Sequence, residues 1–527
     1  MTHARPRSFP AALRALLSPR AYPHPAGSVT LVETHISWVL LAGAFAYKIK
    51  RPVCLPFLDQ SSLERRHFLC LEELRLNRRF APALYLDVVG IGLQDGEARI
   101  GAENAAIEYA VRMHRFDRVQ ELDQLLADRA VEPPALAQFG RDLAQLQARL
   151  PRAQAGDSWG RPETLRIIVM KNFDELLQAA ATISTIPKVE PIRAALLQKL
   201  ESVESSLQQR RDTGYVREGH GDLHTRNIVR IDGRLLPFDC VDFEPAFRWI
   251  DVADEAALLL MELEARGWPQ HGQAFWAGWL ESSGDYGAHR VLDLYKAHRA
   301  LVRAKVAALT MDPASPPAER QPLLDEHCAL LKSADRALAP RPVLLLLIGG
   351  VSGSGKTWLA QRLAPALRMI HVRSDCERRR LGGLGSVAHS NSDLGQDLYS
   401  PAMTEAVYQR LSECAEAILA GNHSALIDAT FSSRDERRRF AALASRVGVR
   451  IGMIHCQAEL PVLRARLAER QRAGQDLSEA DSAVLDWQLQ RREPVGDNEG
   501  IEVIELDTTR PALAAVAEAA VRNRFCG

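Results

Sequence analysis

The feature that most constrains this chain is a glycine-rich loop that directly follows a run of apolar residues. Residues 343–348 read Val-Leu-Leu-Leu-Leu-Ile, and residues 350–357 read Gly-Val-Ser-Gly-Ser-Gly-Lys-Thr, a complete G-x-x-x-x-G-K-[ST] pattern. A buried strand that leads into a glycine turn and then a helix directs backbone N–H groups at a bound anion. The sequence therefore predicts a phosphate-binding loop (P-loop) between a strand at 343–348 and a helix at 358–367.

The pattern also assigns chemistry to the individual residues of this loop. Lys356 is expected to reach the β and γ phosphates of a nucleotide, and Thr357 to hold Mg²⁺. ATP and Mg²⁺ are therefore the expected cofactors. The expected ATP-binding residues of the loop are Gly350, Val351, Ser352, Gly353, Ser354, Gly355, Lys356 and Thr357. The alternative is an incidental glycine turn, which the flanking strand and helix disfavour.

Composition limits the class of protein. A chain of 527 residues is too long for one ordinary core, so two or three domains are expected. The 66 basic and 66 acidic residues cancel, which gives no global field for duplex DNA or an anionic membrane. The eight cysteines form no C-x-x-C pair and suit a reducing cytosol. No apolar run approaches the roughly 18 residues of a membrane span, so a soluble, cytoplasmic protein without a membrane partner is expected.

The order of apolar segments predicts a multidomain chain. Residues 1–28 contain repeated prolines and are expected to form a flexible N-terminal arm. Residues 29–335 begin with strands at 37–41, 44–49, 84–91 and 107–113 and a helix at 63–80, and then become mostly helical, which predicts a bilobal α+β domain. After a linker at 336–342, residues 343–527 alternate strands with helices. The strands expected there are 343–348, 371–374, 425–428, 449–455 and 501–506. That alternation predicts an α/β domain whose parallel sheet is flanked by helices.

A second chemical centre lies in the N-terminal half. The segment 220–227 reads His-Gly-Asp-Leu-His-Thr-Arg-Asn, and Asp239 directly follows the apolar segment 235–238. Phosphoryl transfer from Mg·ATP needs a carboxylate for the acceptor hydroxyl, and an amide and a second carboxylate for the metal. Asp222, Asn227 and Asp239 supply these groups. Upstream, Lys48 stands on an expected strand where kinases keep the lysine that grips the nucleotide phosphates.

At these residues the chain resembles the aminoglycoside phosphotransferase and choline kinase branch of the protein-kinase-like fold, over roughly residues 30 to 330. The resemblance implies that Lys48 is a catalytic and ATP-binding residue, that Asp222 is the catalytic base, and that Asn227 and Asp239 are Mg²⁺ ligands. It also implies a hinge for adenine after the strand 107–113.

Several assignments in this half stay open. The partner of Lys48 is Glu72 or Glu73, and the acid that supports the catalytic loop is Asp251, Asp254 or Glu255. The expected nucleotide loop, 41–44, has a single glycine, Gly43. Lys48 and Lys50 could instead be an exposed charge pair on an edge strand. His220 and His224 could be satisfied core histidines.

Downstream of the P-loop, acids again stand where expected strands end. Asp375 follows the strand 371–374, Arg378 lies one helical turn later, and Asp428 ends the strand 425–428. Asp375 can accept a proton from a hydroxyl, Arg378 can hold an anionic substrate group, and Asp428 suits Mg²⁺. The alternative is that Asp375 caps a helix and Arg378 is a solvated charge. Arg464, Arg466, Arg470 and Arg472 form either a solvated helix face or a lid over the transferring phosphoryl group.

This combination resembles the small P-loop kinases, especially polynucleotide kinases and zeta-toxin-like proteins, over roughly residues 342 to 520. The resemblance implies that Asp375 is the acceptor base, Arg378 an acceptor contact, and Arg466 and Arg470 ATP-binding lid residues. The order of the two modules is similar to a bacterial family that fuses an aminoglycoside phosphotransferase-like domain to an ATP-binding P-loop domain.

The leading interpretation is an ATP-dependent bifunctional phosphotransferase, with each module transferring a phosphoryl group to a hydroxyl acceptor of unknown identity. One alternative is an ATP-binding regulatory protein or slow ATPase. Another is a nucleic-acid 5′-hydroxyl kinase, which nearby basic residues permit but which lacks a clear aromatic platform. Acids at 244–255 would suit a polycationic aminoglycoside, but helix surfaces often carry such clusters. Both acceptors and the oligomeric state are open at this stage.

Overall fold

A computed structural model describes residues 9–55, 58–101, 105–181, 189–311, 315–383, 400–473 and 482–525. Its contacts divide the chain into two compact units. Unit 1 comprises Met1–Phe139, Gln145–Lys171 and Leu207–Gly267, and unit 2 comprises Gly140–Ala144, Asn172–Ser206 and Trp268–Gly527. Within the described ranges, no helix is both long and apolar enough to cross a membrane. The division does not fall at 336–342, so the domain boundaries expected from the sequence stay a prediction.

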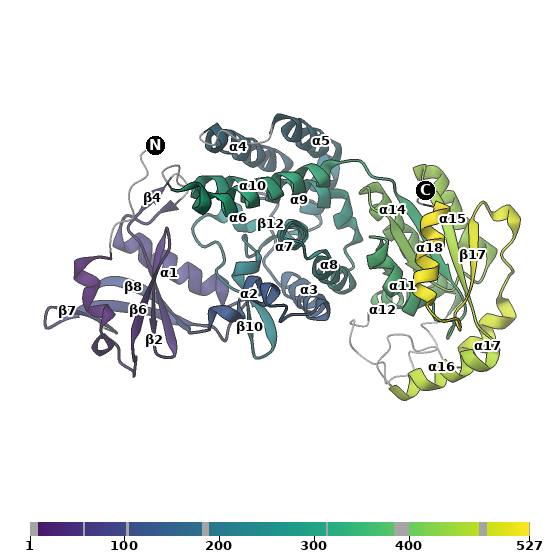
Figure 1. The fold of residues 1–527 in the computed structure, drawn as a ribbon, viewed down its shortest axis with the longest axis horizontal. Helices are drawn as coiled ribbons and strands as arrows, with labels where there is room; N and C mark the ends of the chain where they lie inside the picture. The colour runs from purple at the N-terminus through teal and green to yellow at the C-terminus, as the bar shows by residue number, and fades with distance from the viewer. Residues whose placement is uncertain are drawn as a thin grey trace. The chain divides into compact units, whose positions relative to one another are not determined.

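Unit 1 contains a six-stranded antiparallel sheet in the order β1-β2-β3-β8-β6-β7 (Figure 1). The strands are β1 (Val29–Glu33), β2 (Ser37–Ala42), β3 (Phe45–Lys50), β6 (Tyr85–Gln94), β7 (Glu97–Ile100) and β8 (Ala106–His114). The strands predicted at 37–41, 44–49, 84–91 and 107–113 correspond to β2, β3, β6 and β8. Because β3 pairs with β2 and β8, the strand that carries Lys48 lies inside the sheet.

Helix α1 (Leu63–Asn77) crosses this sheet and contacts β6 and β8. Ser62 caps its N-terminus by accepting a hydrogen bond from the backbone N–H of Arg65, which satisfies one of the free amides of the first turn. The buried face of α1 includes Leu69, Cys70, Glu73 and Leu76. The carboxylate of Glu73 is therefore carried into a buried interface close to the inner strands.

The described part of the expected N-terminal arm is not flexible but packs into the core of unit 1. Two short 3₁₀ helices, η1 (Ala11–Leu17) and η2 (Pro19–Ala21), precede β1. Phe9, Leu16 and Tyr22 are buried in one cluster with Trp38 and Tyr47. The prolines exclude a regular α-helix but not a packed segment, and the burial of apolar side chains outweighs their effect. Residues 1–8 of the arm lie outside the described residues.

The rest of unit 1 carries the second chemical centre on short elements. They are α2 (Leu122–Ala127), β9 (Val216–Glu218), β10 (Ile228–Ile231), β11 (Arg234–Pro237), α6 (Pro245–Arg248), β12 (Trp249–Asp251) and α7 (Val252–Ala265). β10 and β11 form a hairpin, and β12 pairs with β9. Helices α3 (Pro133–Gln147), α4 (Pro162–Ala181) and α5 (Glu190–Asp212) contribute residues to both units.

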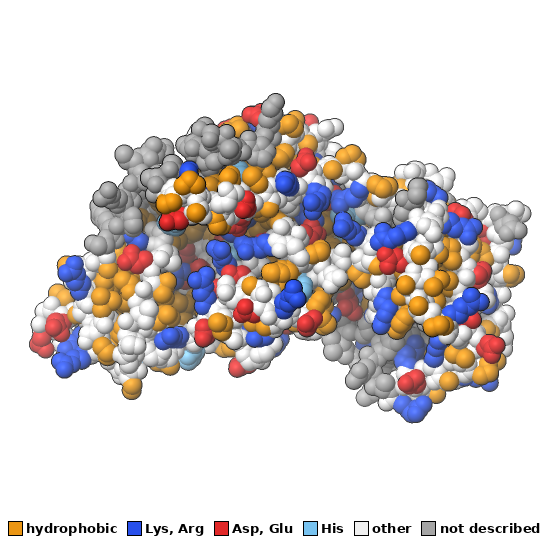
Figure 2. All heavy atoms as spheres, viewed as in Figure 1, with side chains coloured by type: hydrophobic (Ala, Val, Ile, Leu, Met, Phe, Trp, Pro, Cys, Tyr) orange, Lys and Arg blue, Asp and Glu red, His pale blue; other side chains and the backbone are white. Residues whose placement is uncertain are grey.

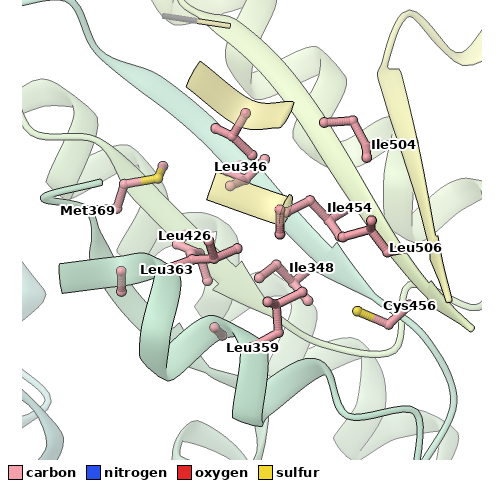
Figure 3. Close-up of a cluster of buried hydrophobic side chains, with 14 of the residues drawn as sticks. Leu346, Ile348, Leu359, Leu363, Met369, Leu426, Ile454, Cys456, Ile504 and Leu506 are labelled. Atoms are coloured by element: carbon pink, nitrogen blue, oxygen red, sulfur yellow. The ribbon is translucent and has the colours of Figure 1, made fainter. Parts of the chain in front are cut away.

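Unit 2 contains a parallel sheet in the order β14-β15-β13-β16-β17. The strands are β13 (Leu344–Gly349), β14 (Ile370–Arg373), β15 (Ala425–Asp428), β16 (Arg450–Gln457) and β17 (Glu502–Asp507), each within a few residues of its expected position. Every residue of the central strand β13 is buried. Side chains of the sheet pack against α11 (Lys356–Ala366) and α18 (Leu513–Phe525), as Figure 3 shows for Leu346, Ile348, Leu359 and Leu363. The predicted parallel sheet with flanking helices is confirmed.

Three helices that precede the P-loop region also belong to unit 2: α8 (Pro269–Ser283), α9 (His289–Thr310) and α10 (Pro317–Leu338). The buried carboxylate of Asp293 in α9 pairs with Arg341 and lies 3.2 Å from His423 Nε2. Arg410 donates a 2.6 Å hydrogen bond to the backbone oxygen of Gly284. Polar contacts therefore tie α8 and α9 to the P-loop region, so experiments on this site should use the full chain.

The remaining helices of unit 2 surround the sheet. They are α12 (Ser374–Leu381), α14 (Pro401–Ala420), α15 (Arg434–Val447), α16 (Leu460–Ala473) and α17 (Ser482–Arg491). A capping box at Ser433 and Glu436 begins α15, because each residue's side chain accepts a hydrogen bond from the other's backbone N–H.

Candidate active sites

The predicted nucleotide lysine of unit 1, Lys48, lies in a buried ion network. Its Nζ is 2.8 Å from Glu73 Oε1 and 2.5 Å from Asp239 Oδ1. The neighbouring Glu72 instead pairs with Arg75 at 2.8 Å. Consecutive helix residues point about 100° apart, so only Glu73 faces β3. The partner left open by the sequence is therefore Glu73, and the alternative of an exposed edge-strand charge pair is wrong.

Electrostatics keep this pair ionised. Burial alone would lower the pKa of Lys48, but Asp239 and Glu73 raise it well above its ordinary value. Burial would likewise raise the pKa of Asp239, but Lys48 outweighs burial and lowers it. Each charge thus stabilises the charged form of the other. The Asp239 side chain keeps 45% of its surface accessible, so its carboxylate can still be reached by a cation.

The residues of the predicted catalytic loop lie together next to this network. The side-chain amide of Asn227 donates a 3.0 Å hydrogen bond to the backbone oxygen of Asp222, which leaves its Oδ1 as the atom for a metal. His224 Nε2 lies 3.4 Å from the Asp222 carboxylate, which is 41% exposed. Asp239 has a left-handed backbone (φ 63°), and its N–H donates to the Tyr85 hydroxyl at 3.1 Å. The donor set of an amide oxygen and a carboxylate fits Mg²⁺.

Of the three acids considered for support of the catalytic loop, Glu255 holds it directly. Glu255 Oε1 accepts hydrogen bonds from the backbone N–H groups of His220 and, at 3.2 Å, Gly221. Gln147 donates to the other Glu255 oxygen at 2.7 Å. A Cβ at Gly219 would lie 2.5 Å from Glu255 Oε1, so this close approach requires glycine.

Asp251 has a different function, because it pairs with Arg210 at 2.6 Å and caps α7 through the N–H of Ala253. Sequence reasoning narrowed the loop support to three acids. It missed Gln147, which lies 108 residues from its partner and belongs to no motif.

Gly43, the single glycine of the expected nucleotide loop, makes a close backbone contact with the N-terminal segment. Gly43 lies in the turn between β2 and β3, and a Cβ there would lie 2.5 Å from the backbone oxygen of Pro25. With φ of 59°, the position also favours glycine sterically. Gly43 thus allows the N-terminal segment to pack closely on this turn, and coverage of the phosphates by residues 41–44 stays a prediction.

In unit 2 the P-loop has the backbone that its glycines predict. Gly350, Gly353 and Gly355 have φ values of 144°, 81° and 82°, and α11 begins at Lys356. A Cβ at Gly350 would lie 2.6 Å from the backbone oxygen of Cys456, and one at Gly353 would lie 2.8 Å from that of Leu463. Both glycines are thus required by conformation and by close approach. The loop therefore leads directly into the N-terminus of α11, where an anion would bind.

The strand-end acid Asp428 lies beside this loop, since it pairs in register with Ile348 of β13. Its Oδ2 is 3.3 Å from His371 Nε2, while its buried Oδ1 has no hydrogen-bond partner among the described residues. Burial would raise its pKa, but His371 and Lys356 lower it, so the carboxylate is ionised. A buried carboxylate oxygen without a donor is costly unless a cation completes it. Asp428 with the Thr357 hydroxyl therefore fits Mg²⁺.

The predicted acceptor residues lie on α12. Arg373 is the N-cap of this helix and Asp375 lies in its first turn, so the alternative that Asp375 is an N-cap is wrong. Asp375 and Arg378 are both half-buried. The buried Glu377 between them pairs with Arg380 and Arg410 at 3.3 and 3.0 Å. The helix that carries the expected acceptor base is therefore held firmly from its opposite side.

The predicted lid arginines lie on α16. Arg466 Nη1 donates to Gly353 O at 3.3 Å and to Thr508 Oγ1 at 2.9 Å, so Arg466 joins the P-loop to the end of β17. Arg470 is half-buried one turn later.

Sequence reasoning missed two further contacts that connect the P-loop to α16 and α17. Val351 is buried with Leu463, Leu467 and Leu485. The N–H of Ser352 donates to Gln488 Oε1 at 2.8 Å. The residues that Val351 and Ser352 contact belong to no sequence pattern that predicts either contact.

Comparison with known proteins found similarity to both parts of the chain. Residues 345–495 match the family model of an AAA domain. The chain is similar to the solved structure of an amicoumacin kinase in complex with AMP-PNP, Ca²⁺ and Ami (14% identity, 58% of this chain and 88% of that chain, TM-score 0.38). It is also similar to the APS kinase of Mycobacterium tuberculosis in complex with AMPPNP and APS (20% identity, 35% and 97%, TM-score 0.25).

Longer similarity is found with uncharacterized proteins of Mycobacterium bovis and of two Mycobacterium tuberculosis strains. Each is 30% identical over 465 residues, which cover 87% of this chain and 91% of the relative. The similarity thus spans both units rather than the P-loop region alone. The chain belongs to the same family as these mycobacterial proteins.

Proposed function

We propose that this protein is an ATP-dependent phosphotransferase with two active sites, one in each unit, each acting on a hydroxyl acceptor. The observation that carries the proposal is the network of Lys48, Glu73 and Asp239 beside the Asp222–Asn227 loop. It joins a nucleotide lysine, metal-binding oxygens and an accessible carboxylate in one place. The P-loop with Asp428 supplies an equivalent set in unit 2.

In the unit 1 site, Lys48 would leave Asp239 to bind the ATP phosphates, while Glu73 keeps the lysine in place. Asn227 and Asp239 would hold Mg²⁺, which when bound neutralises the charge of the phosphates. Asp222 would orient the acceptor hydroxyl and accept its proton. The hydroxyl oxygen then forms a bond to the γ-phosphorus while the bond to the β–γ bridging oxygen breaks, and ADP leaves.

In the unit 2 site, the amides of the P-loop and Lys356 would hold the β and γ phosphates. Thr357 and Asp428 would hold Mg²⁺. Asp375 would accept the proton of the acceptor hydroxyl, and Arg378 would bind an anionic group of the acceptor. Arg466 and Arg470 would reach the nucleotide from α16, and the contact of Arg466 with Gly353 supports this position.

The charge distribution does not favour nucleic acid as the acceptor. Figure 2 shows Lys and Arg side chains lying among Asp and Glu side chains on the face drawn, in keeping with a formal net charge of zero. A small hydroxyl compound is therefore preferred to an oligonucleotide, whose backbone needs an extended basic surface.

The test is Mg·ATP turnover by the full chain and by its Lys356→Ala and Asp222→Asn variants. Acceptors would include aminoglycosides, small alcohols, nucleosides and 5′-hydroxyl oligonucleotides. ADP release with one acceptor that is lost only in Lys356→Ala, and with another acceptor that is lost only in Asp222→Asn, would support two active sites. Loss in one variant only would support the site of that unit alone. ATP binding without turnover on any acceptor would contradict it and favour a regulatory protein. If Asp222→Asn unfolded the chain or left turnover undiminished, its assignment as the base would be wrong.

A further inference from the structure

A second lysine on β3 lies deeper in the unit 1 network than Lys48. Lys50 follows Lys48 by two positions, so both side chains lie on the same face of the sheet. Lys50 Nζ is 2.5 Å from Glu73 Oε2 and forms a further ion pair with Asp242. The exposed fractions of Lys50, Glu73 and Asp242 are 1%, 0% and 5%.

These contacts form two parallel links between β3 and the segment 239–242. The outer link is Lys48–Asp239, and the inner link is Lys50–Asp242. Glu73 joins them, because one of its oxygens contacts Lys48 and the other contacts Lys50. One carboxylate of α1 is therefore shared by two buried lysines.

The two links differ in their access to solvent. Asp239 is 45% exposed, whereas Asp242 is 5% exposed. The outer link involves the groups that the proposed reaction needs, so it must open when Lys48 takes up phosphates and Asp239 takes up Mg²⁺. The inner link is sealed from both ligands and can stay closed.

We propose that Lys50 and Asp242 are a positioning pair for the nucleotide lysine. They hold Glu73 and the segment 239–242 against β3 while Lys48 and Asp239 exchange their mutual contact for ATP and Mg²⁺. This inference rests on the proposed function of the unit 1 site. It assigns a function to two buried charges that do not themselves touch nucleotide, metal or acceptor.

Charge balance indicates how the pair can be tested. Loss of Lys50 alone leaves Asp242 buried without its cation and Glu73 with only one, which destabilises a protein strongly, whereas replacing a whole buried ion pair by apolar residues is often tolerated. The test variant is therefore the double substitution Lys50→Met with Asp242→Leu. The matched control replaces another buried pair of unit 1, which joins α1 to β8: Arg66→Met with Glu108→Leu.

The experiment uses the full chain with Lys356→Ala, which is expected to remove nucleotide binding at the P-loop. Calorimetry measures the affinity for Mg·AMP-PNP, and thermal unfolding measures stability. We expect the Lys50/Asp242 double variant to unfold cooperatively but to bind about 10-fold more weakly, a typical coupling within one charge network. The Arg66/Glu108 control should bind like the parent. Asp242→Glu, which restores the carboxylate, should bind nearly as tightly as the parent.

Two outcomes would overturn the inference in distinguishable ways. If the double variant binds as tightly as the parent, the inner link has no positioning function and the proposed function is untouched. If the parent itself binds no Mg·AMP-PNP, and Lys48→Met does not differ from it, the proposed function of unit 1 fails together with this inference. Should the double variant unfold, the neutral polar pair Lys50→Gln with Asp242→Asn serves instead, with about 3-fold weaker binding expected and unchanged binding as the contradicting result.

Discussion

The two candidate sites differ in how their lysines are paired. In unit 1 the proposed nucleotide lysine is already paired, because Lys48 contacts both Glu73 and Asp239. In unit 2, among the residues that the structure describes, Lys356 has no carboxylate at ion-pair distance, and Asp428 Oδ1 has no donor. Lys48 of unit 1 is thus held in a closed ion network, whereas Lys356 of unit 2 has no such network among the described residues.

This difference predicts that removal of a charge affects folding stability in unit 1 but only nucleotide binding in unit 2. A charge removed from a closed, buried network leaves its former partners uncompensated, so folding should suffer as much as function. A charge removed from the P-loop breaks no ion pair within the described residues, so binding should suffer alone. Substitutions in the two units test this contrast.

The strongest test of the closed network is Glu73→Ala. Glu73 is fully buried and contacts two lysines, so its loss should lower the free energy of unfolding by about 3–5 kcal/mol. Chemical denaturation followed by circular dichroism measures this loss. The control is Glu72→Ala on the same helix, whose side chain is 18% exposed and pairs with Arg75. Equal losses in the two variants would contradict a special function of Glu73.

The corresponding change in unit 2 is Lys356→Ala in the full chain. We expect nucleotide affinity at the P-loop to fall by about 100-fold or more, since the main cation of the phosphate site is lost. The free energy of unfolding should stay within about 0.5 kcal/mol of the parent. Calorimetry should then detect one nucleotide site in place of two. Lys332→Ala, an exposed position on α10, is the control. A large loss of stability in Lys356→Ala would break the contrast between the units.

A smaller effect is expected from the contact between the P-loop and α17. Gln488→Met keeps the length of the side chain but removes the acceptor of the Ser352 N–H. A buried amide left without a partner costs about 1–3 kcal/mol, so nucleotide affinity at the P-loop should fall by roughly 10-fold. Gln490→Met, at an exposed position of the same helix, is the matched control. Unchanged affinity in Gln488→Met would show that the loop holds its shape without α17.

The smallest effect concerns a carboxylate of unit 1 that lies outside the closed network. Burial, followed by the charge of Asp123, raises the pKa of Glu121 from 4.5 to about 7. The folded state therefore binds more protons than the unfolded state between these values, and the stability that Glu121 contributes is lost as pH rises toward and through 7.

Glu121→Gln should remove this pH dependence. We expect the variant and the parent to match below about pH 4.5 and the variant to be more stable at pH 8, by on the order of 1 kcal/mol after allowance for solvent screening. Thermal unfolding across this pH range makes the measurement. Parallel stability curves for the two proteins would contradict the raised pKa.

Local sequence patterns predicted the framework of both sites. The P-loop, the five strands of the parallel sheet and the inner strands of unit 1 lie within a few residues of their expected positions. These features depend on glycine conformations and on apolar periodicity, which act over short stretches of chain. The expected flexible arm failed for a related reason. Prolines indicate locally irregular structure. Phe9 and Leu16 are buried because they pack against strands that come later in the sequence.

By itself, the sequence determined where the strands end in acidic residues and where the glycine loop lies. These features are local, because the backbone geometry there depends on neighbouring residues. Only the tertiary structure decided which side chains meet. It selected Glu73 over Glu72, assigned Glu255 to the catalytic loop, and joined Lys50 to Asp242 across 192 positions. Such contacts depend on which face of an element is buried and on the packing of distant segments. In a low-dielectric interior, that packing also determines which charges can stay ionised.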